Sequence, residues 1–444
     1  MKRLRILLYP LLFLYFFTLL HFLYFECFTA DSIYQYGFSY ALRLGEIPYV
    51  DFNMVVTPFS TFLYVIPLLF YNSYMSLSIF QALLLTVLFG FLFKRYGIKT
   101  FILLVLFSSI QPLQFVKILY SGYCFLILAE FILLIYLEEK EDPGFITGIV
   151  LSLVFLTKQT VGIPLLGIFI YYLFKNKKKM INMIKGYVIL PIIFLIYLLL
   201  TNSFIPFFDQ CFLGLFEFAG NNYSELIFII IFILQLIFLI YKFIKEKNVK
   251  YLYLLLYVGC TLPSIDCYHY AIFMFLFIFV LFKDVDIKIS NIAICTFCSI
   301  SMLFLHSLYI GLVYNFNFKG NVVHDNHFEY TIRKKKDEDG KYVREYLSKY
   351  KDKKIILLSY LSYYYKIMYD LPIEKYDLLN NGNNGLNGSK KIKEMLEKEN
   401  DVYIIIDRID LPKPYEYDTS IADFVAYNYE LIEDKINTRV YYKK

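Results

Sequence analysis

The sequence predicts a mainly α-helical, polytopic membrane protein with a small α/β domain at its C-terminus. Of its 444 residues, 59% are hydrophobic and 18% are charged, whereas soluble proteins are about half apolar and about a quarter charged. Apolar runs long enough to span a bilayer recur through residues 1–314. Residues 315–444 carry 45 of the 82 charged residues. These observations exclude an ordinary soluble enzyme and predict a membrane domain over 1–315 and a water-soluble domain over 318–444.

The apolar runs predict about eleven membrane spans. They lie near 6–25, 74–93, 98–114, 116–137, 145–174, 186–201, 225–241, 251–264, 268–282 and 289–314. The run 145–174 is too long for one span and is interrupted at Lys158-Gln159, which predicts two short spans meeting at one membrane face. The run 6–25 is longer than the apolar core of a signal peptide and lacks a good cleavage site, so we interpret it as the first span.

The basic residues predict the orientation of these spans. Eighteen Lys and Arg residues fall on the side of the membrane that holds the N-terminus, and only Arg43, Lys117 and Lys158 fall on the other side. Because loops rich in Lys and Arg stay in the cytoplasm, the N-terminus is expected there. The C-terminal domain is then expected outside the plasma membrane.

The C-terminal residues predict alternating strands and helices. Residues 353–358 and 402–407 are short apolar runs typical of buried strands, and helices are expected at 389–399 and 419–427. The cluster Asn380–Gly388 between them favours a flexible turn, with an anion-binding loop at a helix N-terminus as the alternative. With 23 basic and 22 acidic residues the domain is nearly neutral, which argues against nucleic acid as a partner.

The first outer loop, residues 26–73, holds the residues most suggestive of function. It predicts two surface helices, one over 32–44 and one opened by Thr57-Pro58. Asp31 precedes the first helix, and Leu44-Gly45, Pro48-Tyr49 and Asp51-Phe52 form the pattern L-G-x-x-P-Y-x-D-F between the two. Ionisable residues near a membrane are costly, so those that persist are candidates for a site.

This loop resembles the first outer loop of GT-C glycosyltransferases. These membrane enzymes use sugars linked to polyprenyl phosphate, as do the protein O-mannosyltransferases and the lipid A aminoarabinose transferases. Residues 155–164 are similar to the segment L-x-K-G-x-x-G-x-x-P of the same family. This sequence departs from the family at Ser32, where many relatives have Glu, at Gln159, where they have Gly, and in loop 111–117, which has no acidic residue.

Sugar transfer from a lipid phosphate needs a base for the incoming hydroxyl and positive charge for the departing phosphate. Asp31 suits the first role and Lys158 the second, and the resemblance implies inversion in one displacement. Gln159, Arg43 and His269 are further candidates for binding the donor. Tyr49, Asp51 and Asp266 are candidates for the acceptor side or for a turn. The absence of a second carboxylate favours a site without a divalent metal, and no other cofactor is expected.

Each candidate also has a purely structural interpretation. Asp31 can cap the helix that follows it, Lys158 can extend from a span end toward water, and Asp51 can stabilise the turn after Pro48-Tyr49. Arg43 can face lipid headgroups, and for His269 a hydrogen-bonded histidine at a span end is the favoured interpretation. The polar residues of loop 202–224 are Asp209, Glu217, Asn221 and Asn222. They can be ordinary solvated loop residues or contribute to the acceptor side of a site.

The expected partners are therefore the bilayer, a polyprenyl-phosphate-linked sugar and a glycan, lipid or protein acceptor. A transporter or lipid flippase is the main alternative, although only Glu130 is expected deep in a span. A non-enzymatic envelope protein that displays its C-terminal domain is a third hypothesis, but such an anchor needs one span rather than eleven.

Overall fold

The computed structural model shows a mainly helical chain that divides into two compact units. One unit contains residues 1–27, 75–194 and 223–319, and the other contains 28–74, 195–222 and 320–444. The residues described are 2–18, 30–97, 99–100, 103–104, 122–221, 224, 226–262, 265, 267–282, 323–324, 327, 329–331, 341–359, 361–377, 383–407, 419–435 and 437–443. Predicted span 289–314 lies outside them.

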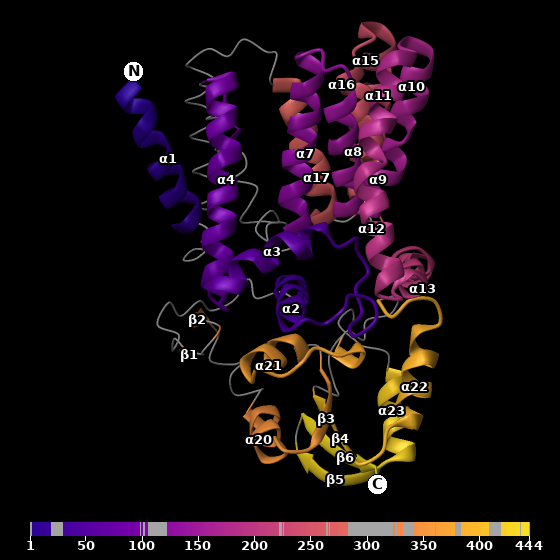
Figure 1. The fold of residues 1–444 in the computed structure, drawn as a ribbon. Coiled ribbons are helices and arrows are strands. Elements are labelled where there is room, and N and C mark those ends of the chain that lie inside the picture. Colours follow the sequence, from indigo (N-terminus) through magenta and orange to yellow (C-terminus); the bar gives the residue numbers. More distant parts are fainter. Residues whose placement is uncertain are drawn as a thin grey trace. The chain divides into compact units, whose positions relative to one another are not determined.

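The first unit, hereafter the helical body, consists of helices that run side by side (Figure 1). They are α1 (Lys2–Phe17), α4 (Tyr74–Tyr96), α7 (Gly122–Glu139), α8 (Phe145–Thr157), α9 (Gln159–Leu165), α10 (Gly167–Lys175), α11 (Lys177–Tyr187), α15 (Leu226–Glu246), α16 (Val249–Leu256), the 3-10 turn η4 (Tyr257–Thr261) and α17 (Cys267–Phe282). Helix α12 (Ile189–Leu200) continues α11 and leads into the second unit.

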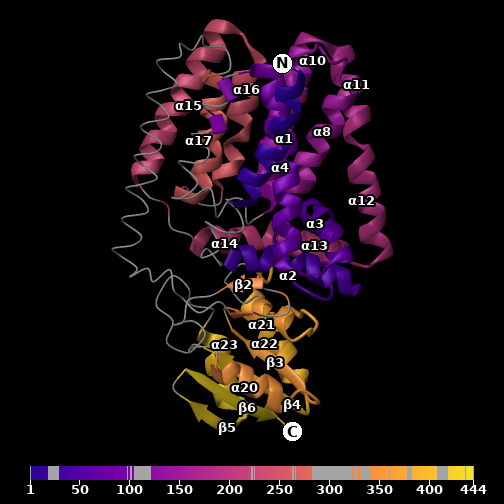
Figure 2. The ribbon, with the colours of Figure 1, turned by 90° about the vertical axis from the view of Figure 1, so that its left-hand side faces the viewer.

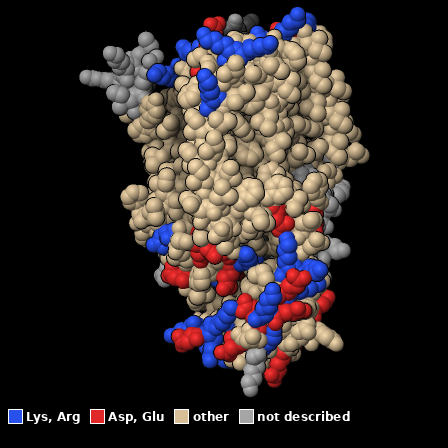
Figure 3. Space-filling model, turned by 45° about the vertical axis from the view of Figure 1, so that its right-hand side comes forward, with Lys and Arg blue, Asp and Glu red and all other residues tan. Residues whose placement is uncertain are grey.

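Three helical stretches in the described part of the chain are long and apolar enough to cross a membrane. They are Tyr74–Tyr96, Lys177–Leu200 and Leu226–Glu246. The described residues also form shorter apolar helices, most of them within predicted spans. They are Leu7–Phe17, Phe59–Phe70, Phe145–Thr157, Gln159–Lys175, Val249–Thr261 and Ile272–Leu281. The face seen in Figure 3 has a broad band without charged side chains, and Lys and Arg gather at one end of it. Membrane association is thus supported by length and composition.

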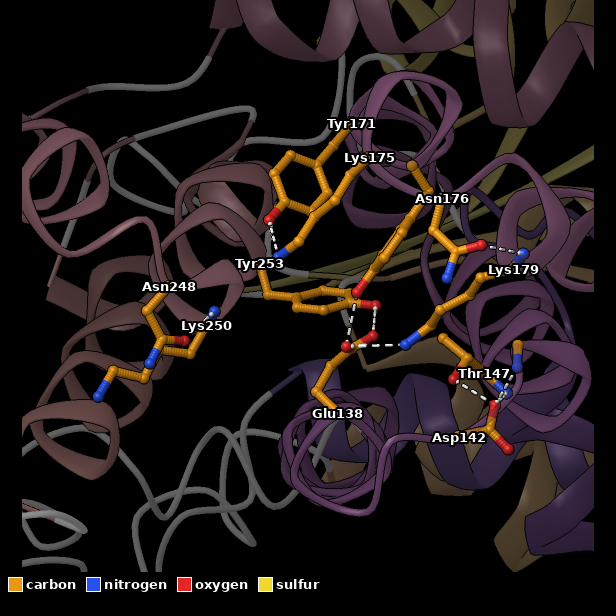
Figure 4. A network of polar contacts seen from close by, with 12 residues as sticks. Glu138, Asp142, Thr147, Tyr171, Lys175, Asn176, Lys179, Asn248, Lys250 and Tyr253 are labelled. Carbon is orange, nitrogen blue, oxygen red and sulfur yellow. Dashed lines mark hydrogen bonds and ion pairs between the residues drawn. The ribbon is translucent and has the colours of Figure 1, made fainter.

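Helix ends of the helical body meet around Glu138, in the last turns of α7. Its Oε2 accepts hydrogen bonds from the Tyr172 hydroxyl at 2.6 Å and from Lys179 Nζ at 2.9 Å, and its Oε1 accepts one from the Tyr253 hydroxyl at 3.0 Å. Figure 4 shows Lys179 of α11 and Tyr253 of α16 converging on this carboxylate, and Tyr172 comes from α10. Next to it, Glu139 pairs with Arg95 of α4 at 3.0 Å. The ends of five helices are therefore joined at one end of the helical body.

The second unit, hereafter the αβ unit, joins three segments that are far apart in the sequence. The first contributes α2 (Ala30–Leu44) and α3 (Phe59–Phe70), and the second contributes α13 (Phe204–Phe208), the π-helical turn η3 (Asp209–Leu213) and α14 (Gly214–Asn221). The third supplies β1 (Val323–His324), β2 (Glu329–Thr331), α20 (Lys341–Lys349), β3 (Lys354–Leu358), α21 (Ser362–Met368), η5 (Lys375–Asp377), α22 (Gly388–Lys398), β4 (Val402–Asp407), α23 (Thr419–Asn428), β5 (Glu430–Lys435) and β6 (Thr438–Lys443).

A four-stranded sheet with the order β3-β4-β6-β5 forms the core of the C-terminal segment. Strands β3 and β4 are parallel, and β6 is antiparallel to both of its neighbours. Because side chains alternate between the two faces, Ile404 and its partner Tyr441 pack in the apolar cluster with α22 and α23, while Tyr403 and its partner Tyr442 lie on the other face. Figure 2 shows α20 in front of this sheet. The predicted strands and the helices at 389–399 and 419–427 are confirmed.

Helix α2 is buried on all sides rather than on one stripe. Ile33 to Ala41 are all buried, and the Tyr363 ring of α21 lies so close to Gly37 that a Cβ there would be 1.8 Å from it. The ring of Phe38 stacks on that of Phe52, with centroids 5.9 Å apart. This helix is thus an interior element of the αβ unit.

Replacing Glu138 with Gln should lower the free energy of unfolding by about 3 kcal/mol, because Lys179 would keep a buried charge without a counter-ion. The two side chains of this pair are only 10% and 11% exposed. The matched control is Glu139→Gln, since the Arg95 and Glu139 side chains are 38% and 22% exposed and the loss should stay below about 1 kcal/mol. Unfolding midpoints of the purified protein in one detergent measure both. Equal losses of unfolding free energy in the two variants would contradict the assignment of Glu138 and Lys179 as a buried, stabilising ion pair.

Candidate functional site

Helices α8 and α9 form a tight hairpin in the helical body, with Lys158 at its tip. Lys158 has an extended backbone (φ −154°, ψ 112°) between Thr157, which ends α8, and Gln159, which begins α9. Gly162 packs so closely against α8 that a Cβ there would lie 2.3 Å from Phe155 Cα. Only a residue without a side chain permits this approach. The break predicted at Lys158-Gln159 is therefore confirmed.

The side chains at the hairpin tip are buried. Lys158 is 5% exposed; its Nζ donates a hydrogen bond to the Leu262 carbonyl at 3.3 Å and lies 5.1 Å from the centroid of the Tyr123 ring. Gln159 is buried as well. A carbonyl and an aromatic face both stabilise an ammonium group. A buried lysine among apolar helices is costly and marks a candidate binding site for an anion.

A buried carboxyl group lies next to this tip. The Thr157 hydroxyl donates a hydrogen bond to Glu130 Oε1 at 2.6 Å, and Glu130, in the middle of α7, is 5% exposed. Its Oε2 has no hydrogen-bond partner among the described residues, and neither has the buried Tyr257 hydroxyl, with which it interacts electrostatically. The hairpin tip thus brings together a lysine, a carboxyl group and two hydroxyls.

The candidates of the first outer loop belong to the αβ unit. Arg43 Nε donates a hydrogen bond to the Leu68 carbonyl at 2.9 Å and so ties the end of α2 to the last turn of α3. Asp51 Oδ2 accepts a hydrogen bond from the Ile47 N–H at 2.7 Å. Tyr49, in that turn, has a left-handed backbone (φ 70°) and donates its hydroxyl to the Val56 carbonyl at 2.9 Å. Asp51 thus stabilises the turn, as its structural interpretation predicts.

Of the remaining candidates, Asp31 and His269 lie in the first turns of helices. Helix α2 begins at Ala30, two residues before its predicted start, so Asp31 lies inside the first turn. The side chain of Asp31 lies outside the described residues, so its capping and catalytic interpretations stay predictions. His269 is half-buried in the first turn of α17. Asp266 and Asn222 lie outside the described residues.

The αβ unit contains a cavity of about 450 Å³, lined in part by Tyr49. Residues of all three of its segments line this cavity. They are Tyr49, Asn53, Phe204, Ile205, Pro206, Phe208, Asp209, Gln210, Leu213, Lys375, Asn384, Gly388, Lys391, Ile392 and Met395. Sequence patterns indicated Tyr49, Asp209 and, within the cluster Asn380–Gly388, Asn384 and Gly388; the others were not indicated because the proximity of their segments depends on the tertiary fold.

Two adjacent residues of η3, Asp209 and Gln210, form hydrogen bonds to the other two segments that line this cavity. Gln210 Oε1 accepts a hydrogen bond from the Met54 N–H at 2.8 Å, and its Nε2 donates to the Tyr49 carbonyl at 3.1 Å. Asp209 accepts from the Leu386 N–H at 3.2 Å and from Lys391 Nζ at 2.5 Å. One residue therefore anchors η3 to the first segment, and its neighbour anchors η3 to the third.

The turn before α22 binds anionic groups of the protein itself. Besides the contacts of Asp209, Glu217 Oε1 accepts a hydrogen bond from the Asn387 N–H at 2.6 Å. Gly385 has φ +78°, and a Cβ there would lie 2.1 Å from Asp209 Oδ2, so the position requires glycine. In the described part of the cluster Asn380–Gly388, residues 383–388, backbone N–H groups thus donate to carboxylates of η3 and α14; binding of a ligand anion there stays a prediction.

Glu46, beside the turn of Tyr49, is a buried acidic group that sequence analysis did not single out. Its Oε1 accepts a hydrogen bond from the Ile373 N–H at 3.1 Å. Burial, together with the nearby carboxyl groups of Asp51 and Asp377, raises the pKa of Glu46 to about 7. Lys366 is also buried, and its Nζ lies 3.2 Å from Glu374 and 3.8 Å from Asp377.

Comparisons of the chain with models of known families, with curated proteins and with solved structures find no match. Among the described residues, no three His, Cys, Asp or Glu side chains gather as metal ligands. The fold by itself defines the class as a mainly helical protein with helices of membrane-spanning length and a small C-terminal sheet.

The stability of the protein should fall as the pH rises from 5 to 8, and Glu46→Gln should reduce this fall. Glutamate has a pKa near 4.3 in an unfolded chain, whereas burial raises the pKa of Glu46 to about 7 in the folded protein. The folded state therefore holds a proton that the unfolded state releases, and this stabilisation is lost as the pH rises through 7. Asp377, whose pKa burial raises to about 6, contributes in the same direction.

Unfolding midpoints of the detergent-solubilised protein, measured at half-unit intervals of pH, provide the test. Glu345→Gln, at an exposed position of α20, is the matched control and should keep the slope of the wild type. An unchanged slope in Glu46→Gln would exclude Glu46 as its origin.

Proposed function

We propose that the protein is a polytopic membrane glycosyltransferase of the GT-C kind, with about eleven spans, a cytoplasmic N-terminus and an extracytoplasmic C-terminal domain. It transfers a sugar from a polyprenyl-phosphate-linked donor to a glycan, lipid or protein acceptor. The observation that carries this proposal is the buried Lys158 at the tip of the α8–α9 hairpin, 5% exposed within apolar helices. An ionisable residue that is buried at a break between two apolar helices is a candidate for contacting the phosphate of a lipid-linked donor.

The proposed reaction is a single displacement at the anomeric carbon of the sugar. Asp31 accepts the proton of the incoming hydroxyl as its oxygen forms the new bond to that carbon. The bond from the carbon to the phosphate oxygen breaks on the opposite side, which inverts the configuration. Lys158 stabilises the negative charge on the departing phosphate, and Gln159, Arg43 and His269 contribute to binding the donor.

The grouping of basic residues supports the proposed orientation. Several helix ends that carry basic residues lie together at one end of the helical body. Glu138 contacts Lys179 and Tyr253, Glu139 contacts Arg95, and Tyr251, next to Lys250, contacts Glu246. Sequence analysis assigns all of these ends to the cytoplasmic side, where Lys and Arg are enriched.

A transporter or lipid flippase is the second candidate, and Glu130 favours it. Buried carboxyl groups within spans often carry protons or bind cations in transporters, and Glu130 is buried with one oxygen lacking a hydrogen-bond partner among the described residues. In this case Glu130→Gln should stop the movement of labelled lipid or solute in reconstituted vesicles, and no sugar would be transferred.

Deleting the gene should cause a polyprenyl-phosphate-linked sugar to accumulate, which mass spectrometry of extracted lipids identifies. Complementation with Lys158→Ala or Asp31→Asn should leave the accumulation in place, since loss of one electrostatic contact or of the base slows such steps by about 100-fold or more. Lys158→Arg should restore part of the activity, because it keeps the charge.

Lys178→Ala and Asp352→Asn, at exposed positions, are the matched controls and should complement fully. Variants are compared at equal abundance in the membrane and with equal unfolding midpoints. Full complementation by Asp31→Asn would reject the assigned base, and full complementation by Lys158→Ala would reject the phosphate site. If no lipid-linked sugar accumulates in the deletion strain, the glycosyltransferase proposal is wrong.

A further inference from the structure

The cavity of the αβ unit has an apolar wall and a basic part. Phe204, Ile205, Phe208 and Leu213 line it from α13 and η3, and Ile392 and Met395 line it from α22. Two lysines, Lys375 and Lys391, and one carboxylate, Asp209, line the same cavity, so the charges of its lining sum to +1. An apolar surface beside positive charge suits a ligand that is apolar at one end and anionic at the other.

The apolar wall follows directly from a membrane-length helix. The stretch Lys177–Leu200 is long and apolar enough to span a bilayer, and α13 begins at Phe204, four residues after it ends. A segment so close to a span end lies at the membrane surface by chain connectivity alone. Its apolar side chains are exposed, with Ile205 at 77% and Phe208 at 47%. Such side chains are expected at the boundary between headgroups and acyl chains.

Some polar groups that line the cavity already have hydrogen bonds or ion pairs with other residues of the protein, and others do not. Asn53 Nδ2 donates hydrogen bonds to the Lys375 carbonyl at 2.9 Å and to Asn384 Oδ1 at 2.7 Å, and Gln210 is engaged by the first segment. Lys391 pairs with Asp209 at 2.5 Å. The ammonium of Lys375, in contrast, has neither an ion pair nor a hydrogen bond among the described residues. Burial and the nearby ammonium of Lys391 lower the pKa of Lys375, while the charge of Asp51 opposes this shift. The net direction indicates a partly desolvated charge that an anion in the cavity would stabilise further.

We propose that this cavity binds the phosphate headgroup of an anionic membrane lipid, with Lys375 contacting the phosphate and the acyl chains lying along α13. The ammonium of Lys391 adds positive charge beside it while remaining paired with Asp209. The proposal is independent of the glycosyltransferase reaction, since it requires only that α13 lies at a membrane surface. It gives the αβ unit a binding site of its own, in which Lys375 was not indicated by any sequence motif.

The chain has no tryptophan, so Phe204→Trp introduces a single fluorescent reporter into the cavity wall. The full-length variant is reconstituted into nanodiscs that contain either brominated phosphatidylglycerol or brominated phosphatidylcholine, because bromine quenches tryptophan on contact. Quenching by the anionic lipid should reach half of its maximum at a several-fold lower mole fraction than quenching by the zwitterionic one. The double variant with Phe204→Trp and Lys375→Gln should lose this preference for the anionic lipid.

Lys390→Gln is the matched control, because it removes the same charge from the residue before Lys391 but does not line the cavity; it should keep the preference. Equal quenching by the two lipids, or a preference that survives Lys375→Gln, would overturn the proposal. A second arm adds inorganic phosphate in detergent without anionic lipid. A shift of the tryptophan emission by millimolar phosphate, without any lipid preference in nanodiscs, would assign the site to soluble phosphates and reject the lipid.

Discussion

The αβ unit depends on the two side chains of Asp209 and Gln210. They are adjacent in a π-helical turn, and their hydrogen bonds run to segments more than 150 residues away in opposite directions along the sequence. Such turns occur often at functional sites. Gln210 satisfies backbone groups of Tyr49 and Met54, which would otherwise be buried without partners. Asp209 and Glu217 bring the negative charge that the turn before α22 attracts. Without these contacts the cavity would lose its apolar wall.

Helix α7 of the helical body carries a buried carboxyl group, Glu130, and a largely buried one, Glu138, and their surroundings differ. Glu138 accepts hydrogen bonds from three side chains, one of them a lysine, whereas Glu130 accepts one from Thr157 and keeps an oxygen without a partner among the described residues. A fully satisfied buried charge fixes helix positions, and an incompletely satisfied one marks a place where a ligand or proton is expected. The second case lies beside Lys158, which makes the hairpin tip the strongest candidate for chemistry in the helical body.

Sequence patterns predicted some elements well because each depends on local chemistry. A lysine and a glutamine interrupting a long apolar run predicted the break between α8 and α9, and the apolar strand formers at 353–358 and 402–407 predicted the strands β3 and β4. Their parallel pairing was not predicted. Strands β5 and β6 were not predicted. Strand β5 is exposed along its length and carries four charged residues, as edge strands that resist aggregation commonly do. Its sequence therefore lacks the alternation by which strands are recognised.

The sequence by itself determined the class of this protein, since spans, basic clusters and the charged C-terminal segment follow from how much apolar surface each stretch carries. It also indicated Lys158, because an isolated charge within apolar residues is visible without coordinates. Only the tertiary structure decided that the first outer loop, residues 204–217 and the C-terminal segment form one unit, and that Lys375, Lys391 and Gln210 share a cavity. Hydrogen bonds between segments so far apart leave no periodicity in the sequence, because each partner is a single polar residue whose role depends on what lies opposite it.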